Sequence, residues 1–133
     1  MYLVDTNIWL EVLLEQAKNA ESHEFLETTE SSLLHITDFS FYSIGIVLTR
    51  LRKSDVLNKF ISDVIIESNV SIIRLDPEGI REIIKIEKKW GLDFDDSYQY
   101  VSAEKHDLTI VSFDSDFDRT EKGRITPGTS KRE

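Results

Sequence analysis

Apolar residues in this chain fall into two patterns, short continuous runs and longer stretches with a spacing of three or four residues. The continuous runs are rich in Val, Ile and Leu, which is typical of strands buried on both faces of a parallel sheet. Four segments have this pattern: residues 1–5, 32–37, 71–75 and 108–113. We therefore expect a parallel sheet with at least these four strands.

Helical spacing occupies the stretches between the strands. Asp76 and Pro77 provide an N-cap and a first-turn proline for one of these helices, and Gly91 would end it. Strands that alternate with helices predict an α/β domain with helices on both faces of a central parallel sheet. The predicted helices cover residues 8–13 with Thr6 as cap, 20–29, 40–52, 54–68, 78–90, and a stretch from Asp95 or Asp96 to 105.

Length and composition favour a single domain. The chain has 133 residues, 40% of them hydrophobic and none of them cysteine, so a continuous core fits and disulfides and thiolate zinc sites are excluded. No apolar run approaches the roughly 20 residues that cross a bilayer, and the start lacks the positive charge of a signal peptide. We expect a cytoplasmic domain over residues 1–128 and a polar tail over 129–133.

The net charge of -9 argues against a protein that coats nucleic acid through its overall field. Many of the acids are concentrated between residues 93 and 118, whereas basic residues such as Arg50, Arg52 and Lys53 lie outside this stretch. The distribution is compatible with an acidic pocket in basic surroundings.

Three aspartates are placed where a parallel α/β sheet collects its ligands, beyond the carboxyl ends of the strands. Asp5 and Asp114 each follow a predicted strand, and Asp96 starts a predicted helix at the same edge. Carboxylates about 4 Å apart repel by roughly 4 kcal/mol at an effective dielectric constant near 20, so such a cluster requires a proton or a cation. Oxygen-only ligands favour Mg²⁺ or Mn²⁺, and this chemistry points to phosphodiester cleavage.

Simpler roles exist for the same acids. An aspartate at a helix start is most often an N-cap, which is our interpretation of Asp95 and an equal alternative for Asp5. Asp114 also fits a turn, and Asp116 is a candidate fourth ligand. The histidines are scattered and form no nucleophilic triad with a serine and an acid. Three further acids are interpreted as solvated: Asp93, Asp107 and Asp118.

Two motifs resemble the PIN domain family. Residues 1–14, MYLVDTNIWLEVLL, resemble the opening of that domain, and residues 94–119, FDDSYQYVSAEKHDLTIVSFDSDFDR, resemble its closing half. Residues 125–127 resemble its terminal strand, so the resemblance covers nearly the whole chain. It implies a single PIN-like domain with a central parallel sheet of four or five strands. The positions that match the closing motif are Asp96, Ala103, Ser112, Asp114, Asp116 and Phe117.

The resemblance also implies a function. PIN domains are metal-dependent ribonucleases, and single domains of this length are commonly VapC-like toxins that pair with a small antitoxin. Our hypothesis is a catalytic site in which Asp5, Asp96 and Asp114, with Asp116, bind Mg²⁺ or Mn²⁺ and water attacks an RNA phosphate. An antitoxin and a second copy of the chain are the expected protein partners. Side chains expected to orient the ligands or water are Thr6, Asn7 and Ser112.

One position departs from the family pattern. The family usually has a glutamate in the helix after the second strand, and the matching residue here is Ser43. Asp38 is nearly two turns earlier, while Asp95 or Asp116 would compensate for the lost charge. A PIN domain that has lost catalysis and serves as an RNA-binding or protein-interaction module is therefore the first alternative. An Asp-nucleophile phosphatase is a more distant one, because Asn7 stands where its second acid belongs.

Overall fold

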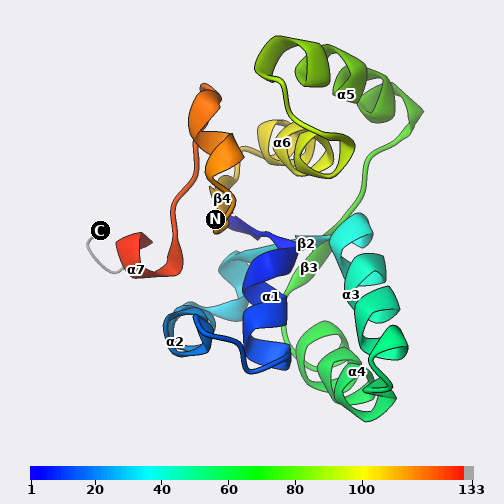
Figure 1. Ribbon diagram of the computed structural model, residues 1–133, viewed down its shortest axis with the longest axis vertical. Helices are drawn as coiled ribbons and strands as arrows, with labels where there is room; N and C mark the ends of the chain where they lie inside the picture. Colours follow the sequence, from blue (N-terminus) through cyan, green and yellow to red (C-terminus); the bar gives the residue numbers. More distant parts are fainter. Residues whose placement is uncertain (131–133) are drawn as a thin grey trace.

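The computed structural model describes residues 1–130, which form a central parallel sheet with helices on both of its faces (Figure 1). The strand order is β3-β2-β1-β4, and every pairing is parallel. This arrangement confirms the predicted fold class. The elements are β1 (Tyr2–Val4), α1 (Thr6–Leu13), α2 (Asn19–Thr28), η1 (Ser31–Leu33), β2 (Leu34–Thr37), α3 (Asp38–Arg50), α4 (Ser54–Phe60), η2 (Ile61–Ile66), β3 (Ser71–Ile73), α5 (Pro77–Trp90), α6 (Phe94–His106), β4 (Thr109–Val111), η3 (Ser115–Arg119) and α7 (Pro127–Ser130).

Strand β1 lies in the middle of the sheet, between β2 and β4. Leu3 pairs with His35 on one side and with Ile110 on the other. The segments that follow β1 and β4 therefore emerge side by side at one edge. Val111, the last residue of β4, forms a single parallel bridge with Ile125. The terminal strand suggested by the family resemblance is therefore reduced to one residue.

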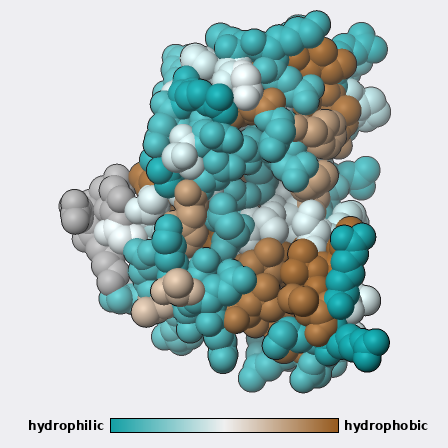
Figure 2. Space-filling model, in the orientation of Figure 1, coloured by the Kyte–Doolittle hydropathy of each residue, from teal (hydrophilic) through white to brown (hydrophobic). Residues whose placement is uncertain are grey.

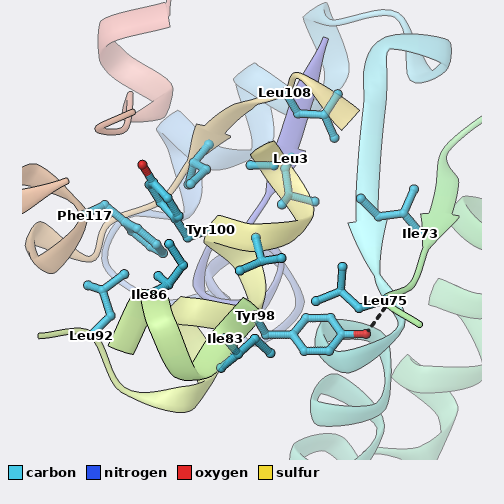
Figure 3. Close-up of a cluster of buried hydrophobic side chains, with 13 residues drawn as sticks. Leu3, Ile73, Leu75, Ile83, Ile86, Leu92, Tyr98, Tyr100, Leu108 and Phe117 are labelled. Atoms are coloured by element: carbon cyan, nitrogen blue, oxygen red, sulfur yellow. Dashed lines mark hydrogen bonds between the residues drawn. The ribbon is translucent and has the colours of Figure 1, made fainter. Parts of the chain in front are cut away.

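Successive residues of a strand point to opposite faces, so the sheet separates two hydrophobic cores. Leu3 belongs to the core beneath α5 and α6, and the adjacent Val4 belongs to the core beneath α1–α4. Figure 3 shows the first core, in which Tyr98 reaches from α6 towards the segment after β3. The Tyr98 hydroxyl accepts a hydrogen bond from the backbone N–H of Leu75 at 3.1 Å and donates to Asp38 Oδ1 at 2.6 Å.

Two helix starts differ from the prediction. The N-cap of α1 is Asp5, whose side chain accepts a hydrogen bond from the backbone N–H of Thr6, so Thr6 itself is the first helical residue. The N-cap of α6 is Asp93, which accepts from the backbone N–H of Asp96. An N-cap side chain bonds the N–H two or three residues further on, and Asp93 is the acid with that spacing. The interpretations of Asp95 as the cap and of Asp93 as a solvated acid were therefore wrong.

Two further segments differ in their extent. The helix predicted over residues 54–68 is α4 followed by η2, a wider π-helical stretch. The predicted tail, 129–133, begins inside α7, and residues 131–133 lie outside the described residues. Within residues 1–130, no helix has the length and apolar character needed to cross a membrane.

Candidate metal centre

A cavity of about 230 Å³ opens at the carboxyl edge of the sheet. The ends of β1 and β4 and the first turns of α1, α3 and α6 surround it. Because β1 and β4 are neighbours, Asp5 and Asp114 reach the same cavity, and α6 adds Asp96. The full lining is Asp5, Thr6, Asn7, Leu10, Phe39, Ser43, Asp95, Asp96, Gln99 and Asp114.

Asp5 is buried and held by several donors. Its Oδ1 accepts hydrogen bonds from the Thr6 backbone N–H at 2.8 Å and from Gln99 Nε2 at 2.8 Å. Its Oδ2 accepts from Ser112 Oγ at 2.7 Å and from Asn7 Nδ2 at 3.4 Å. Burial raises the pKa of Asp5, and the hydrogen bonds from Ser112, Gln99 and Thr6 act in the opposite direction. Asp5 thus combines the capping role with a place in the cavity wall.

Asp96 lies in the first turn of α6 and is 6% exposed. Among the described residues, no hydrogen-bond donor contacts its buried Oδ2 atom. Burial raises the pKa of Asp96 to about 8, with further contributions from the Asp114 carboxyl group and from the charges of Asp93 and Asp5. In the absence of a cation, burial and the neighbouring acids therefore favour the protonated form of this carboxyl group.

Asp114 follows β4 and caps η3, because its Oδ1 accepts a hydrogen bond from the backbone N–H of Asp116 at 2.9 Å. Carboxylate oxygens of Asp96, Asp114 and Asp116 all lie within 4.8 Å of one another. The exposed Asp116 also pairs with Arg119 at 3.4 Å. In the described part of the chain, Asp5 is not a member of this group of three, although it lines the same cavity as Asp96 and Asp114.

Two of the three polar residues predicted to orient the ligands, Ser112 and Asn7, are hydrogen-bonded to each other and to the ends of β1 and β4. Ser112 Oγ donates to Asp5, and it accepts from Asn7 Nδ2 at 3.2 Å and from the Asp114 backbone N–H at 2.9 Å. Asn7 Oδ1 accepts from the backbone N–H of Phe113 at 3.2 Å. These contacts tie the end of β1 to the end of β4. Thr6 instead points to α3, where its hydroxyl donates to Ser40 Oγ at 2.8 Å.

Ser43, the residue that the resemblance places where the family usually has a glutamate, lines the cavity. Asp38 does not replace that acid, since its carboxylate accepts hydrogen bonds from the Tyr98 hydroxyl and from the Phe39 backbone N–H. Asp95 does line the cavity, and burial followed by the charge of Asp93 raises its pKa. The helix α3 therefore contributes a hydroxyl where an acid was expected, and α6 contributes a second acid.

Sequence reasoning missed two residues of this site. Gln99 lines the cavity and contacts Asp5, and Ser40 connects Gln99 with Thr6. The available signal for Gln99 was its position three residues after Asp96, which places both side chains on one helix face. Ser40 left no such signal, because a serine in the first turn of a helix is ordinary.

The residues present fit a hard divalent cation. All of the side-chain donors in the group are carboxylate oxygens, which are the ligands that Mg²⁺ and Mn²⁺ prefer in proteins. The buried Asp96 Oδ2 lacks a hydrogen-bond partner within residues 1–130, and burial together with the neighbouring acids raises the pKa of this carboxyl group, which disfavours its ionisation. A cation between these oxygens would satisfy both conditions.

The fold and the site together define an α/β domain with a carboxylate-lined cavity at the carboxyl edge of a parallel sheet. A model of the PIN domain family matches residues 2–123. The chain therefore belongs to the PIN domain family, as its two motifs predicted. None of the curated proteins compared with the sequence matches it.

Solved structures share the whole fold at low sequence identity. FitAcB from Neisseria gonorrhoeae has a TM-score of 0.78 at 21% identity, covering 96% of this chain and 99% of its own. A toxin-antitoxin complex from Klebsiella pneumoniae has a TM-score of 0.77 at 17% identity, covering 96% and 98%. VapC20 from Mycobacterium tuberculosis, described as a Sarcin-Ricin loop cleaving toxin, has a TM-score of 0.77 at 14% identity, covering 96% and 100%.

Proposed function

We propose that this protein is a metal-dependent endoribonuclease that uses Mg²⁺ or Mn²⁺ to hydrolyse RNA phosphodiesters. The observation that carries the proposal is the group of Asp96, Asp114 and Asp116, whose oxygens lie within 4.8 Å of one another at the edge of a PIN domain sheet. RNA as substrate is supported by VapC20, which has the same fold and is described as cleaving the Sarcin-Ricin loop. We place this activity in the cytoplasm, where its substrate would be met.

In the proposed mechanism, Asp96, Asp114 and Asp116 would hold the ion, and Asp5 completes the cavity wall. When bound, the ion would supply Lewis acidity to the phosphate and lower the pKa of a water molecule, the nucleophile. Ser112 donates a hydrogen bond to the Asp5 carboxylate and accepts one from the Asp114 backbone N–H. It therefore fixes the position of the segment after β1 relative to the segment after β4. Hydrogen bonds from Ser112 and from the Asp116 backbone N–H restrain the Asp5 and Asp114 carboxylates, which would keep the cavity preorganised.

The decisive experiment compares RNA cleavage by the wild-type protein and by Asp96→Asn. We expect cleavage that requires Mn²⁺ or Mg²⁺, stops on chelation, and falls at least a hundredfold in Asp96→Asn, because a neutral amide binds the ion more weakly. Asp107→Asn is the matched control, since Asp107 is an exposed acid at the other end of α6. Equal background from the wild-type protein and Asp96→Asn would refute the ribonuclease assignment.

A second candidate function is a PIN domain that binds RNA or protein without cutting. It is favoured by one observation, the hydroxyl of Ser43 at the cavity position where the family usually has a glutamate. This candidate predicts RNA retention by the wild-type protein in a gel-shift assay and no metal-dependent cleavage of the same RNA. Cleavage that depends on Asp96 would exclude it.

We also propose an antitoxin-type protein partner. Support comes from FitAcB and the Klebsiella pneumoniae complex, whose fold this chain shares, and from an apolar groove of about 450 Å³ between α3 and α4. Figure 2 shows hydrophobic side chains gathered in the lower half of the molecule, where Figure 1 places α1, α3 and α4. A partner with apolar and basic segments would suit this groove and the net charge of -9. The groove is lined by Phe41, Tyr42, Gly45, Ile46, Thr49, Arg50, Leu57 and Ile61.

The partner proposal is tested with the exposed Ile46, which lines the groove. Ile46→Asp should abolish recovery of a small basic protein that co-purifies with the tagged wild-type protein from its native cells. Ile84→Asp is the control, because Ile84 is similarly exposed on α5. Sedimentation of the purified protein tests the other expected partner, a second copy of the chain: a dimer that Ile46→Asp converts to a monomer would assign the groove to self-association.

A further inference from the structure

Gln99 is a buried polar residue in the cavity that neither the motif match nor the acid pattern explains. It is 2% exposed, lies on α6 one turn after Asp96, and lines the cavity. Burying an amide is unfavourable unless its donors and acceptors find partners. The partners of Gln99 therefore indicate why a polar side chain is present at this place.

The amide nitrogen of Gln99 uses both of its N–H groups. Nε2 donates to Asp5 Oδ1 at 2.8 Å and to Ser40 Oγ at 2.6 Å. The orientation of the amide follows from this contact, since the reverse orientation would place Oε1 against the Asp5 carboxylate. Ser40 also accepts the hydroxyl of Thr6 at 2.8 Å. Gln99 thus joins the end of β1 to α3 from its position on α6.

The amide oxygen of Gln99, in contrast to the nitrogen, lacks a hydrogen-bond partner in the described chain. Within residues 1–130, Oε1 is buried and has no hydrogen-bond partner. An acceptor in this condition costs free energy unless something else satisfies it. Asp96 Oδ2, on the same helix face and lining the same cavity, is also buried without a partner in the described chain. Both oxygens belong to residues that line the cavity in which the proposed ion would bind.

Gln99 is uncharged, and this neutrality is as informative as its contacts. Of the α3 side chains that line the cavity, the polar one is Ser43, which carries no charge. The connection between α3 and Asp5 is accordingly made by a neutral amide acting through Ser40. A neutral donor restrains the carboxylate without adding to the repulsion among the acids.

We propose that Gln99 is a positioning residue of the metal centre: its Nε2 fixes the Asp5 carboxylate against α3, at the cavity in which the ion would bind. This inference rests on the proposed metal-dependent function. Loss of Gln99 would remove one of the two donors to Asp5 Oδ1 and the connection of this carboxylate to α3, so Asp5 would be held less firmly. Metal affinity should therefore fall even when the fold is retained.

The test measures Mn²⁺ binding directly, by the loss of the free Mn²⁺ signal in electron paramagnetic resonance. Gln99→Met has nearly the same volume and no hydrogen-bonding groups, so it should preserve packing. We expect its Mn²⁺ dissociation constant to rise by about tenfold to a hundredfold, the usual effect of removing a partner that orients a side chain around a metal site, because Asp5 lines the cavity beside the proposed ligands. Gln16→Met, which makes the same chemical change at an exposed position, should bind Mn²⁺ like the wild-type protein.

Ser40→Ala provides an independent variant, because it removes the second acceptor of Gln99 Nε2 without touching Gln99. We expect a smaller loss of Mn²⁺ affinity, and a double variant no weaker than Gln99→Met alone, since both changes break one connection. A thermal melt in chelator controls for folding. A lower melting temperature with unchanged Mn²⁺ affinity in both single variants would make Gln99 merely structural and overturn the inference.

The outcomes separate this inference from the function on which it rests. Wild-type protein that binds Mn²⁺ together with variants that bind it equally well would overturn the role of Gln99 and leave the metal centre standing. Wild-type protein that binds no Mn²⁺ would overturn the metal centre, and the inference with it.

Discussion

Asp96 is buried in a cavity that also contains the carboxylates of Asp5 and Asp114. Burial is the largest cause of its raised pKa of about 8, and the neighbouring acids add to it. The same features that oppose ionisation of Asp96 favour a cation, because a divalent ion replaces the proton and offsets the repulsion. In the proposed metal centre, a proton and a metal ion would therefore compete for this one side chain.

This competition predicts how the stability of the metal-free protein depends on pH. The pKa of Asp96 is raised from 3.8 to about 8 on folding, so between these values the folded state binds more protons than the unfolded state. The stability contributed by the protonated form is complete below pH 3.8 and is lost as the pH rises through about 8. In chelator, urea unfolding of the wild-type protein should show a free energy that declines from pH 5 towards pH 8.

Asp96→Asn removes the titrating group and should flatten that decline. Asp107→Asn, which changes an exposed acid on the same helix, should retain it. If the profile of Asp96→Asn were parallel to that of the wild-type protein, the raised pKa would be refuted.

Ser43 is the second residue for which a single substitution is informative. Ser43→Glu would restore an acid to a position that lines the cavity. Since each added carboxylate strengthens the attraction for a hard divalent cation, Mn²⁺ affinity should increase, by about tenfold as an order of magnitude. Calorimetric titration with Mn²⁺ measures this, with Ser43→Gln as a control of similar size and no charge. Equal affinity in the two variants would place Ser43 too far from the ion to contribute.

At the level of the elements, α6 organises the site. Its N-cap, Asp93, sets the first turn so that Asp95 and Asp96 are both in the helix and both line the cavity. Gln99 follows on the next turn of the same helix. Tyr98 faces the other way and connects α6 to α3 through Asp38. One helix therefore supplies two acids, an amide and an anchor to the facing helix.

The cap of α6 is testable by substitution. Asp93→Ala removes the acceptor for the Asp96 backbone N–H, a bond of 2.9 Å, and should lower the free energy of unfolding by about 1 kcal/mol. Asp93→Asn keeps a capping oxygen and should lose less. Urea unfolding in chelator measures both changes. An equal loss in the two variants would mean that the charge of Asp93, and not its cap, is what stabilises the helix.

In the whole molecule, the cavity lies where two separate cores meet at one edge of the sheet. Asp5 directly follows Leu3 and Val4, which belong to different cores, so its position depends on the packing of both faces. A ligand in this cavity would meet the segments that follow β1 and β4 together with α1, α3 and α6. Binding there should consequently stabilise the entire domain and not one segment.

Metal removal and addition test this global coupling. A ligand that binds only the folded state stabilises it by about 2.7 kcal/mol at a hundred times its dissociation constant. Saturating Mn²⁺ should therefore raise the urea midpoint of the wild-type protein by a corresponding amount, and chelator should reverse the change. Asp96→Asn should show little response. Stabilisation of both proteins to the same degree would indicate Mn²⁺ binding elsewhere on the acidic surface.

The order of strands and helices was predictable because hydrophobic periodicity depends on residues close together in sequence. The adjacency of Asp5 and Asp114 was predictable too, since parallel strands deliver their ends to one edge. The start of α6 was predicted wrongly, because Asp93, Asp95 and Asp96 are all acceptable caps on a local criterion. Their different roles follow from the spacing that the folded helix adopts.

Local pattern thus carried the fold class, the family motifs and the acids at the strand ends. The local sequence pattern could not predict the contacts of Gln99, because they join residues separated by 94 and 59 positions. The unpartnered oxygen of Asp96 and its raised pKa likewise arise from burial among elements remote in the chain. Periodicity depends on residues that are neighbours in sequence. Desolvation and hydrogen bonding in a cavity depend on residues that are neighbours in space, and only the packing of the folded chain brings such residues together.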